Sequence, residues 1–386
     1  MACFLPFFET YPLIYRDDMF NRYNWPLIIV LTFASLVLAC NPALASKSRV
    51  IVDQDAFEGP GFQPILMLVN SPEVDLLGIT IVSGDGWQAE QTSRTLRMLE
   101  LINRTDIPVA AGATYPLINN KRMAERRDAL YGKPGYKGAW TETWPDNDHM
   151  VRSNFHHPEL IPDFPEGAPK LKPHPVHAAQ FLIEQTRLYP GEITIISMGP
   201  LTNLALAQRL DPNFASRVKE VIMLGGYFNL DLSADHGTFT SQVAYAPRTT
   251  FNQAWDPEAA WIVHHSPWKK LTLVSDDTSV GLFSSPKMLK NINDSNTPVA
   301  NYVGRFAQPG FQLWDEVESA VFLQPDIITT SAEMYISIDI NQGPNYGTII
   351  TWPRGRNPGL DEQLVNVIFG VNRERVEHMF VDLLSK

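Results

Sequence analysis

Short apolar runs alternate with segments of helical spacing along most of the chain. β-Branched and aliphatic runs predict strands at residues 49–53, 75–83, 108–111, 192–198, 218–224 and 270–275. Helical spacing, or a capping residue followed by proline, predicts helices at residues 65–69, 88–103, 175–189 and 201–210 and from 257 onward. Strands that are apolar on both faces are typical of a parallel sheet covered by helices. The pattern therefore predicts an open, doubly wound, mainly parallel α/β sheet with helices on both faces, Rossmann-like in architecture, with ligands beyond the carboxyl ends of its strands.

Two segments depart from this alternation. Residues 334–340 alternate like a strand, and with residues 343–352 they predict an accessory antiparallel hairpin. Residues 119–172 carry tryptophans and many prolines without a clear period, which indicates a lid or a surface insertion. We therefore expect residues 46–386 to form a single domain with an insertion at about 119–172.

The first 45 residues have the pattern of an export signal. The apolar run at residues 27–39 is short for a membrane span and is typical of a secretory signal, with Met19 as a more natural start than Met1. A small-x-small site ending at Ala45 favours cleavage there, which predicts a secreted or periplasmic protein. The residues ending at Cys40 resemble a lipoprotein box, so a lipid anchor through Cys40 stays open, as does an uncleaved amino-terminal anchor.

Composition excludes several classes of protein. The 386 residues carry 31 Lys and Arg against 42 Asp and Glu, a net charge of −11, so nucleic acid is not an expected partner. A hydrophobic content of 44% is enough for a large core. The two cysteines are Cys3 and Cys40, so the chain after residue 40 has no disulfide, thiolate metal site or thiol nucleophile.

Polar residues follow several of the predicted strands directly. Asp53 and Asp55 follow the first strand, Asp85 the second and Met198 the fourth, and a parallel sheet brings these positions to one crevice. Two carboxylates there can hold a hard cation or activate a water, although a solvated turn has the same pattern. Haloacid-dehalogenase phosphatases also carry Asp-x-Asp after their first strand, but Phe57 stands where they need Thr or Val.

Five segments occur in an order that is more specific than any one of them. They are Val50-Ile-Val-Asp-Gln-Asp55, Leu76 to Gly84, Asp106 to Ala113, Gly199-Pro-Leu-Thr-Asn-Leu-Ala205, and Phe251-Asn252 before Asp256-Pro-Glu-Ala-Ala260. Over about residues 49–385 the chain resembles the inosine-uridine nucleoside hydrolase family. The resemblance implies calcium-assisted attack of water on the N-glycosidic bond of a ribonucleoside or related N-riboside.

The resemblance also implies roles for individual residues around the calcium ion. Asp55 matches the acid that binds Ca²⁺ and takes the proton from the attacking water, with Asp53 supporting it. Asp315 matches a calcium ligand. Met198 matches a position that gives the ion its backbone carbonyl, so a change of side chain there is tolerated.

Four other positions match residues that contact the substrate. Asp85 stands where a ribose-contacting Asn follows the Gly, and Asn252 matches a ribose-binding Asn. Trp314 replaces a His that acts as the leaving-group acid, and an aromatic ring there can stack on the base instead. Tyr131 resembles a His in the base-binding loop, although Tyr-Gly turns are common.

One departure from the family pattern puts the activity in doubt. The family's second acidic pair, which holds ribose hydroxyls and completes the calcium shell, falls on Gly59 and Pro60, with Glu58 as the only acid nearby. Two functions remain: an N-glycosyl hydrolase, or a catalytically weak or inactive relative that binds a nucleoside or another glycoside. The joint presence of Asp55 and Asp315 favours the enzyme. The resemblance also implies a small-molecule nucleoside as partner and a homo-oligomer.

Overall fold

The computed structural model describes residues 47–56, 59–132, 136–142, 155–229 and 249–386, and the compact unit from Ala45 to Lys386 is built on one sheet. The order of its nine described strands is β3-β2-β1-β4-β5-β6-β9-β7-β8. Neighbours from β3 through to β9 are parallel, while β7 is antiparallel to both β9 and β8. This confirms the predicted open, mainly parallel sheet. The strands are β1 (Ser48–Gln54), β2 (Val74–Ile81), β3 (Val109–Ala111), β4 (Ile193–Ser197), β5 (Glu220–Leu224), β6 (Leu271–Val274), β7 (Ile328–Ile338), β8 (Ile349–Pro353) and β9 (Gln363–Val371).

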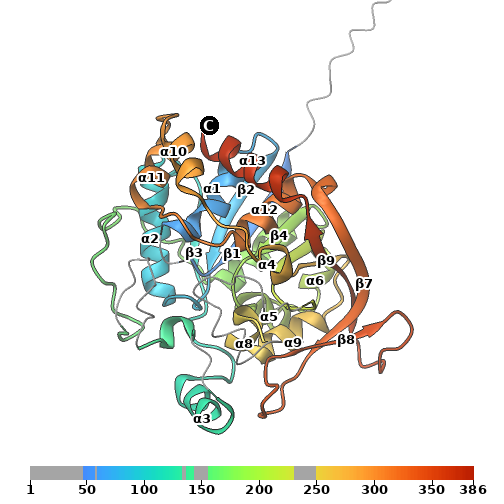
Figure 1. Cartoon of the computed structure of the whole chain (residues 1–386). Helices are drawn as coiled ribbons and strands as arrows, with labels where there is room; N and C mark the ends of the chain where they lie inside the picture. Colours follow the sequence, from blue (N-terminus) through green and yellow to red (C-terminus); the bar gives the residue numbers. More distant parts are fainter. Residues whose placement is uncertain (1–46, 57–58, 133–135, 143–154, 230–248) are drawn as a thin grey trace, which may run out of the picture. The chain divides into compact units, whose positions relative to one another are not determined.

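Helices cover both faces of the sheet (Figure 1). One face packs against α1 (Gln63–Asn70), α2 (Gln88–Leu101), α10 (Pro286–Asn293), α11 (Pro298–Phe306), α12 (Trp314–Leu323) and α13 (Arg373–Leu384). The other packs against α4 (Ala178–Leu188), α5 (Thr202–Leu210), α6 (Phe214–Arg217) and α9 (Pro257–His264). The other helices of the described residues are α3 (Lys121–Tyr131) and α8 (Phe251–Trp255), with short 3₁₀ turns η1 (Pro60–Phe62), η2 (Gly138–Trp140), η4 (Asp276–Thr278) and η5 (Pro325–Ile327).

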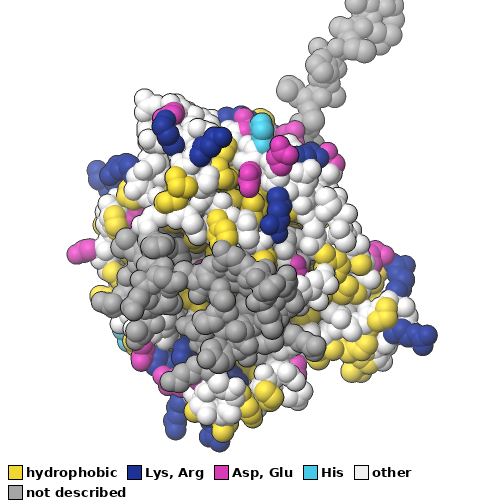
Figure 2. Space-filling model, in the orientation of Figure 1, with side chains coloured by type: hydrophobic (Ala, Val, Ile, Leu, Met, Phe, Trp, Pro, Cys, Tyr) yellow, Lys and Arg dark blue, Asp and Glu magenta, His cyan; other side chains and the backbone are white. Residues whose placement is uncertain are grey.

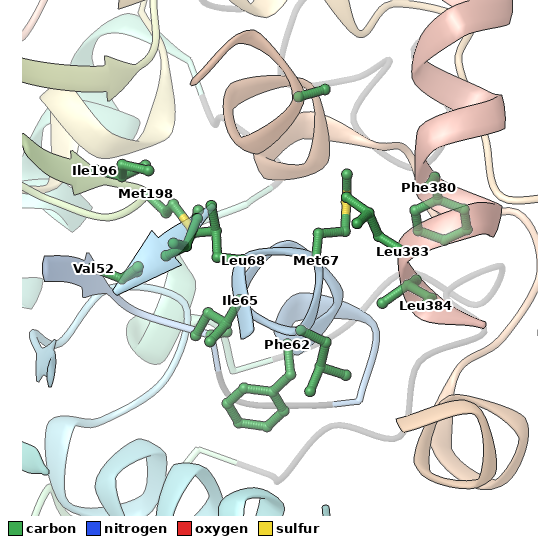
Figure 3. Close-up of a cluster of buried hydrophobic side chains, with 14 of the residues drawn as sticks. Val52, Phe62, Ile65, Met67, Leu68, Ile196, Met198, Phe380, Leu383 and Leu384 are labelled. Atoms are coloured by element: carbon green, nitrogen blue, oxygen red, sulfur yellow. The ribbon is translucent and has the colours of Figure 1, made fainter. Parts of the chain in front are cut away.

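The core on the first face is centred on α1. Figure 3 shows this helix between the sheet, represented by Val52 and Ile196, and Phe380 of α13. Met67 and Leu68 of α1 are fully buried. Burying an aliphatic side chain of this size contributes about 1.5–3 kcal/mol, so these contacts hold α1 against the sheet.

The direction of winding changes between β1 and β4. From β1 the chain builds β2 and then β3 on one side, and after α3, η2 and α4 it returns to pair β4 with the other side of β1. Such a switch point opens a crevice at the carboxyl ends of the two strands. Asp55 follows β1 and Met198 follows β4, so both lie at that opening.

Two local expectations need correction. The hairpin predicted as an accessory pair belongs to the main sheet, because β7 begins at Ile328 and pairs with β9 as well as with β8. Residues 343–348 are loop, and β8 starts only at Ile349. The insertion contains a helix, α3, whose polar sequence hides its period because only Ala124 and Asp128 are buried. Residues 133–135 and 143–154 of the insertion lie outside the described residues.

The amino-terminal prediction falls outside the described residues, since the run at 27–39 and Cys40 precede residue 47. In the described part of the chain, no helix combines the length and apolar character that crossing a bilayer requires. On the face drawn in Figure 2, basic side chains are interspersed with acidic and apolar ones.

Candidate active site

The carboxylate of Asp55 is held at the mouth of the crevice by backbone that approaches it closely. Its Oδ2 accepts a hydrogen bond from the Asp85 amide at 2.9 Å, and Asp55 is almost fully buried. A Cβ at Gly84 would stand 1.9 Å from Oδ2, and one at Gly199 would stand 2.9 Å from Oδ1. Both glycines therefore make room for this carboxylate, one after β2 and one after β4.

Asp53 lies deeper, at the end of β1. Its Oδ1 accepts from Thr80 Oγ1 at 2.5 Å and from Asn203 Nδ2 at 2.8 Å, while Oδ2 has no partner among the described atoms. Burial raises the pKa of Asp53 to about 7, and the hydrogen bonds from Asn203 and Thr80 offset only part of that rise. Its contacts suit a supporting residue beneath Asp55.

The Gly-Pro-Leu-Thr-Asn segment ties the carboxyl ends of several strands together. Besides Asp53, Asn203 Nδ2 binds the Ile81 carbonyl at 3.1 Å, and its Oδ1 accepts from the Ala113 amide at 2.9 Å. Thr202 Oγ1 donates to Asp256 Oδ2 at 2.7 Å. The sequence singled out this motif, and the structure gives it a positioning role that sequence reasoning did not supply.

Acidic side chains converge on Asp55 from separate elements. Burial raises the pKa of Asp55 well above its usual range, and the charges of Asp85 and Asp315 raise it further. Burial also raises the pKa of Asp315, followed by the charges of Asp85 and Asp276. Asp85 comes from the loop after β2, Asp315 from the first turn of α12, and Asp276 from η4 after β6. Sequence reasoning missed Asp276, although it also directly follows a predicted strand.

Two further acids of α12 are fully buried behind this cluster. Burial, and then the charge of Asp315, raises the pKa of both Glu316 and Glu318 well above its usual range. Neither was a candidate in the sequence, because acids at the start of a helix are ordinarily solvated.

The structure brings Met198 and Asn252 into contact. Asn252, on α8, is buried and its Nδ2 donates to the Met198 carbonyl at 3.1 Å. A carbonyl oxygen has two lone pairs, so one stays available for a second partner. Met198 is fixed in turn by its own amide, which donates to the Asp53 carbonyl at 2.8 Å.

The two aromatic candidates differ in their surroundings. Trp314 begins α12 directly before Asp315 and is half-buried against Phe311, with ring centroids 5.5 Å apart. Tyr131 ends α3 and is 51% exposed, on the wall of a cavity that Asp55, Asp85 and Asp315 do not line. An aromatic residue that does contact one of the acids is Tyr136, whose hydroxyl donates to Asp85 Oδ1. Its place in the same loop, five positions after Tyr131, was the signal available in the sequence.

The structure explains why position 59 carries no acid. A Cβ on Gly59 would stand 2.4 Å from the carbonyl oxygen of Phe306 and 2.6 Å from its Cβ. Pro60 is buried and opens η1. The end of α11 therefore occupies the space beside position 59, while Glu58 lies outside the described residues.

The oxygen atoms at the crevice fit a hard cation in type. The charge of Asp315 raises the pKa of Asp55, a repulsion that a bound cation would relieve, and the Met198 carbonyl directly precedes Gly199, which lies against the Asp55 carboxylate. Within the described residues, no three His, Cys, Asp or Glu side chains are grouped so as to hold an ion. A cation bound by Asp55, Asp315 and the Met198 carbonyl would therefore need further ligands, such as water or substrate hydroxyls.

A doubly wound sheet with buried acids at its switch point defines a class of α/β protein that binds and transforms small molecules in that crevice. Residues 50–378 match the family described as inosine-uridine preferring nucleoside hydrolase, and the chain belongs to that family. The predicted family and its enzyme class, nucleoside hydrolase, are confirmed.

The chain is similar to named relatives over most of its length. It is 32% identical over 269 residues to "Probable uridine nucleosidase 2" of Arabidopsis thaliana, covering 69% of this chain and 68% of that protein. It is 25% identical over 319 residues to the pyrimidine-specific ribonucleoside hydrolase RihB of Escherichia coli K12, covering 79% and 87%.

Solved structures share the fold. A plant nucleoside hydrolase superimposes with a TM-score of 0.64 at 23% identity, covering 88% of this chain and 99% of that one. A purine-preferring ribonucleoside hydrolase from Gardnerella vaginalis gives a TM-score of 0.66 at 20% identity, covering 87% and 98%.

Proposed function

We propose that this nucleoside hydrolase cleaves its substrate with the Asp55 carboxylate as the general base, in the crevice between β1 and β4. One observation carries the proposal: Asp85 and Asp315, from two further elements, act on the buried carboxylate of Asp55, which lies against Gly199 directly after Met198. Burial of a carboxylate and the approach of further acids both cost free energy, so a purely structural core would not favour this arrangement. The substrate is a ribonucleoside or related N-riboside.

Each residue has a distinct part in the proposed reaction. Asp55 takes a proton from the water that attacks the anomeric carbon, and the bond from that carbon to the base nitrogen breaks as the base leaves. Asp53, fixed by Asn203 and Thr80, supports Asp55 from below. Asp85 and Asn252 hold the ribose. Trp314 stacks on the base, and Tyr131 contributes an aromatic edge to its surroundings.

We further propose that Ca²⁺ binds to Asp55, Asp315 and the Met198 carbonyl. When bound, such an ion polarises coordinated oxygen atoms and offsets the repulsion between the carboxylates. Gly59 and Pro60 replace the acids that complete the calcium shell in the family, so the affinity for Ca²⁺ is the quantity to measure. Calorimetric titration of the full chain with Ca²⁺ should give a binding isotherm that Asp315→Asn weakens at least about 10-fold. Equal affinities would remove Asp315 from the site.

Substitution of Asp55 tests the reaction itself. Asp55→Asn keeps the size of the side chain and removes the base, so release of free ribose from uridine and inosine should fall by at least about 100-fold. Asp163→Asn, at an exposed position, is the matched control and should retain the wild-type rate. An Asp55→Asn rate within a factor of about two of wild type would exclude Asp55 as the base.

The closed space at Gly59 favours one alternative, a relative that binds nucleosides without turning them over. That alternative predicts saturable binding of uridine or inosine by calorimetry with no release of ribose at any enzyme concentration. Ribose release that depends on Asp55 would reject it.

The amino-terminal pattern supports a proposal about location, and the family resemblance supports one about assembly. We propose export with cleavage after Ala45, giving a secreted or periplasmic protein, with lipidation at Cys40 as the competing process. The intact mass of protein recovered from a secreting host distinguishes the two, since an acyl-modified chain starting at residue 40 differs in mass from one starting at Ser46.

Assembly into a homo-oligomer is the further proposal, and light scattering of the purified chain tests it.

A further inference from the structure

A cavity of about 200 Å³ lies between α3, η2, α8 and the loop before β8. Aromatic rings make up much of its wall, from Tyr131, Tyr136, Trp140, Phe251, Trp255 and Tyr346. Two of them, Trp140 and Trp255, stack with ring centroids 3.9 Å apart. Walls of this kind bind planar or apolar groups and lower the local dielectric around any charge among them.

Arg127 brings a cation to this wall. The half-buried guanidinium lies 4.3 Å from the centroid of the Tyr346 ring and donates to Asn119 Oδ1 at 2.7 Å and to Gln342 Oε1 at 3.0 Å. It forms no ion pair with a carboxylate of the described residues. Burial lowers the pKa of Arg127, which expresses the cost of desolvating this charge.

The remaining charges of the wall leave a positive balance. The charged side chains among the described lining residues are Arg127, Lys137 and Asp128, one cation in excess, and Lys137 Nζ lies 2.7 Å from Asp128 Oδ2. The charges of Asp128 and of Glu258, whose carboxylate accepts from Tyr346, also act on Arg127. A guanidinium has five N–H donors and no acceptor, and within the described residues Arg127 donates to Asn119 and Gln342. In a chain of net charge −11, a local positive wall selects for an acidic group.

The cavity adjoins the residues assigned to the ribose. Tyr136 lines the cavity and donates its hydroxyl to Asp85. Phe251, also on the wall, directly precedes Asn252 and packs edge-on against Tyr136 with ring centroids 5.0 Å apart. The residues assigned to the ribose and the cavity are therefore joined through Tyr136 and through Phe251, the neighbour of Asn252.

We propose that the cavity is a subsite for an anionic substituent of the riboside, bound by Arg127 between the aromatic walls. The inference rests on the proposed function, because it assumes that Asp85 and Asn252 hold a ribose. Two sources can supply such an anion: a phosphate on the ribose 5′ oxygen, or an acidic group on the base. Arg127 is then a specificity-determining residue, and anionic N-ribosides are the preferred substrates.

The experiment compares three substrates and three proteins. The substrates are uridine, uridine 5′-phosphate and orotidine, whose base carries a carboxylate, and the proteins are the wild-type chain, Arg127→Met and Arg126→Met. Arg126 is the matched control, since it is an exposed arginine of the same helix that does not line the cavity.

Loss of a charge-assisted hydrogen bond should lower kcat/KM for one of the two anionic substrates about 10- to 100-fold in Arg127→Met. Uridine should change by no more than about 2-fold, and Arg126→Met should match wild type on all three. The anionic substrate that responds identifies the source of the anion. An equal loss on uridine and on both anions would show a purely structural role for Arg127 and overturn the subsite, as would no loss on any substrate.

Binding measurements separate this inference from the hydrolase proposal. Calorimetry with ribose 5-phosphate and with orotate requires no turnover. Binding of either one that Arg127→Met abolishes supports the subsite even if no riboside is cleaved. Cleavage of uridine by a protein that binds neither anion would keep the hydrolase and overturn the subsite.

Discussion

At the scale of single residues, the site depends on two glycines without a Cβ as much as on its acidic side chains. The strand run before Asp53 and Asp55 placed both acids at a sheet end from sequence alone, and the structure puts them there. That Gly84 and Gly199 leave room for the Asp55 carboxylate was not predictable, because it depends on how closely β2 and β4 flank β1. Likewise Asn203 reaches Asp53 across 150 positions of sequence.

Substitution of Gly84 isolates this close approach. In Gly84→Ala the new methyl would overlap Asp55 Oδ2, so the carboxylate must move, and a displaced catalytic group should lower kcat at least about 10-fold. Overpacking should also cost about 1–3 kcal/mol in the free energy of unfolding. Ribose release and urea denaturation measure the two effects.

Gly343, on the wall of the aromatic cavity, provides the steric control for this substitution, since none of the described atoms beyond its chain neighbours lies within 4 Å of the Cβ it would gain. Gly343→Ala should leave kcat on uridine and the unfolding free energy unchanged. If Gly84→Ala behaved in the same way, the crevice would be more open than the structure shows.

At the scale of elements, capping residues and helical spacing located the helices, whereas hydrogen bonds to residues distant in sequence fix how a helix is joined to the rest of the fold. The Asp-Pro-Glu start predicted the beginning of α9, and Asp256 Oδ1 indeed accepts from the Ala259 amide at 3.1 Å. The other oxygen accepts from the Leu117 amide at 2.9 Å and from Thr202, which joins α9 to the β3 loop and to α5. A sequence pattern shows the cap but not partners 139 and 54 positions away.

Asp256 should therefore contribute more than an ordinary helix cap. Asp256 is fully buried, and Asp256→Ala leaves the Leu117 amide, the Thr202 hydroxyl and the Ala259 amide without their acceptor. We therefore expect the free energy of unfolding to fall by about 3 kcal/mol or more. Asn120→Ala removes an exposed cap of α3 that accepts only from the Met123 amide, and should cost about 1 kcal/mol. Urea denaturation of both variants tests the contrast, and equal losses would mean that the distant contacts of Asp256 add nothing.

At the scale of the whole molecule, the first six strands were predictable, but β9 and the order of the strands in the sheet were not. The alternating pattern identified β1 to β6, because each carries a continuous apolar run. It missed β9, which inserts between β6 and β7 and turns the expected accessory hairpin into the edge of the sheet. Pairing between strands distant in sequence is determined by the packing of the complete sheet. The hydrophobic pattern of one segment therefore does not show which strands will be its neighbours.

The stability of the whole folded chain depends on pH, and we expect His264 to contribute to its loss of stability below pH 6.5. His264 ends α9, is fully buried, and neither ring nitrogen has a partner among the described atoms. Burial, aided by the charge of His265, lowers its pKa from 6.5 to about 3. The imidazole is neutral in both folded and unfolded chains above pH 6.5, so its stability contribution is complete there and is lost as the pH falls toward 3.

At pH 5 the unfolded chain binds a proton at position 264 that the folded chain cannot, which costs the wild type about 2 kcal/mol relative to pH 7. His264→Leu removes this penalty, so its unfolding free energy should fall less between pH 7 and pH 5 by that amount. At pH 7 the variant should be at least as stable as wild type, because two unpartnered buried nitrogens are gone. His378→Leu, at an exposed histidine of α13, should keep the wild-type slope. Urea denaturation of all three proteins at pH 7, 6 and 5 gives the change of unfolding free energy with pH. If this change were the same for His264→Leu and wild type, His264 would take up a proton in the folded chain, without global unfolding.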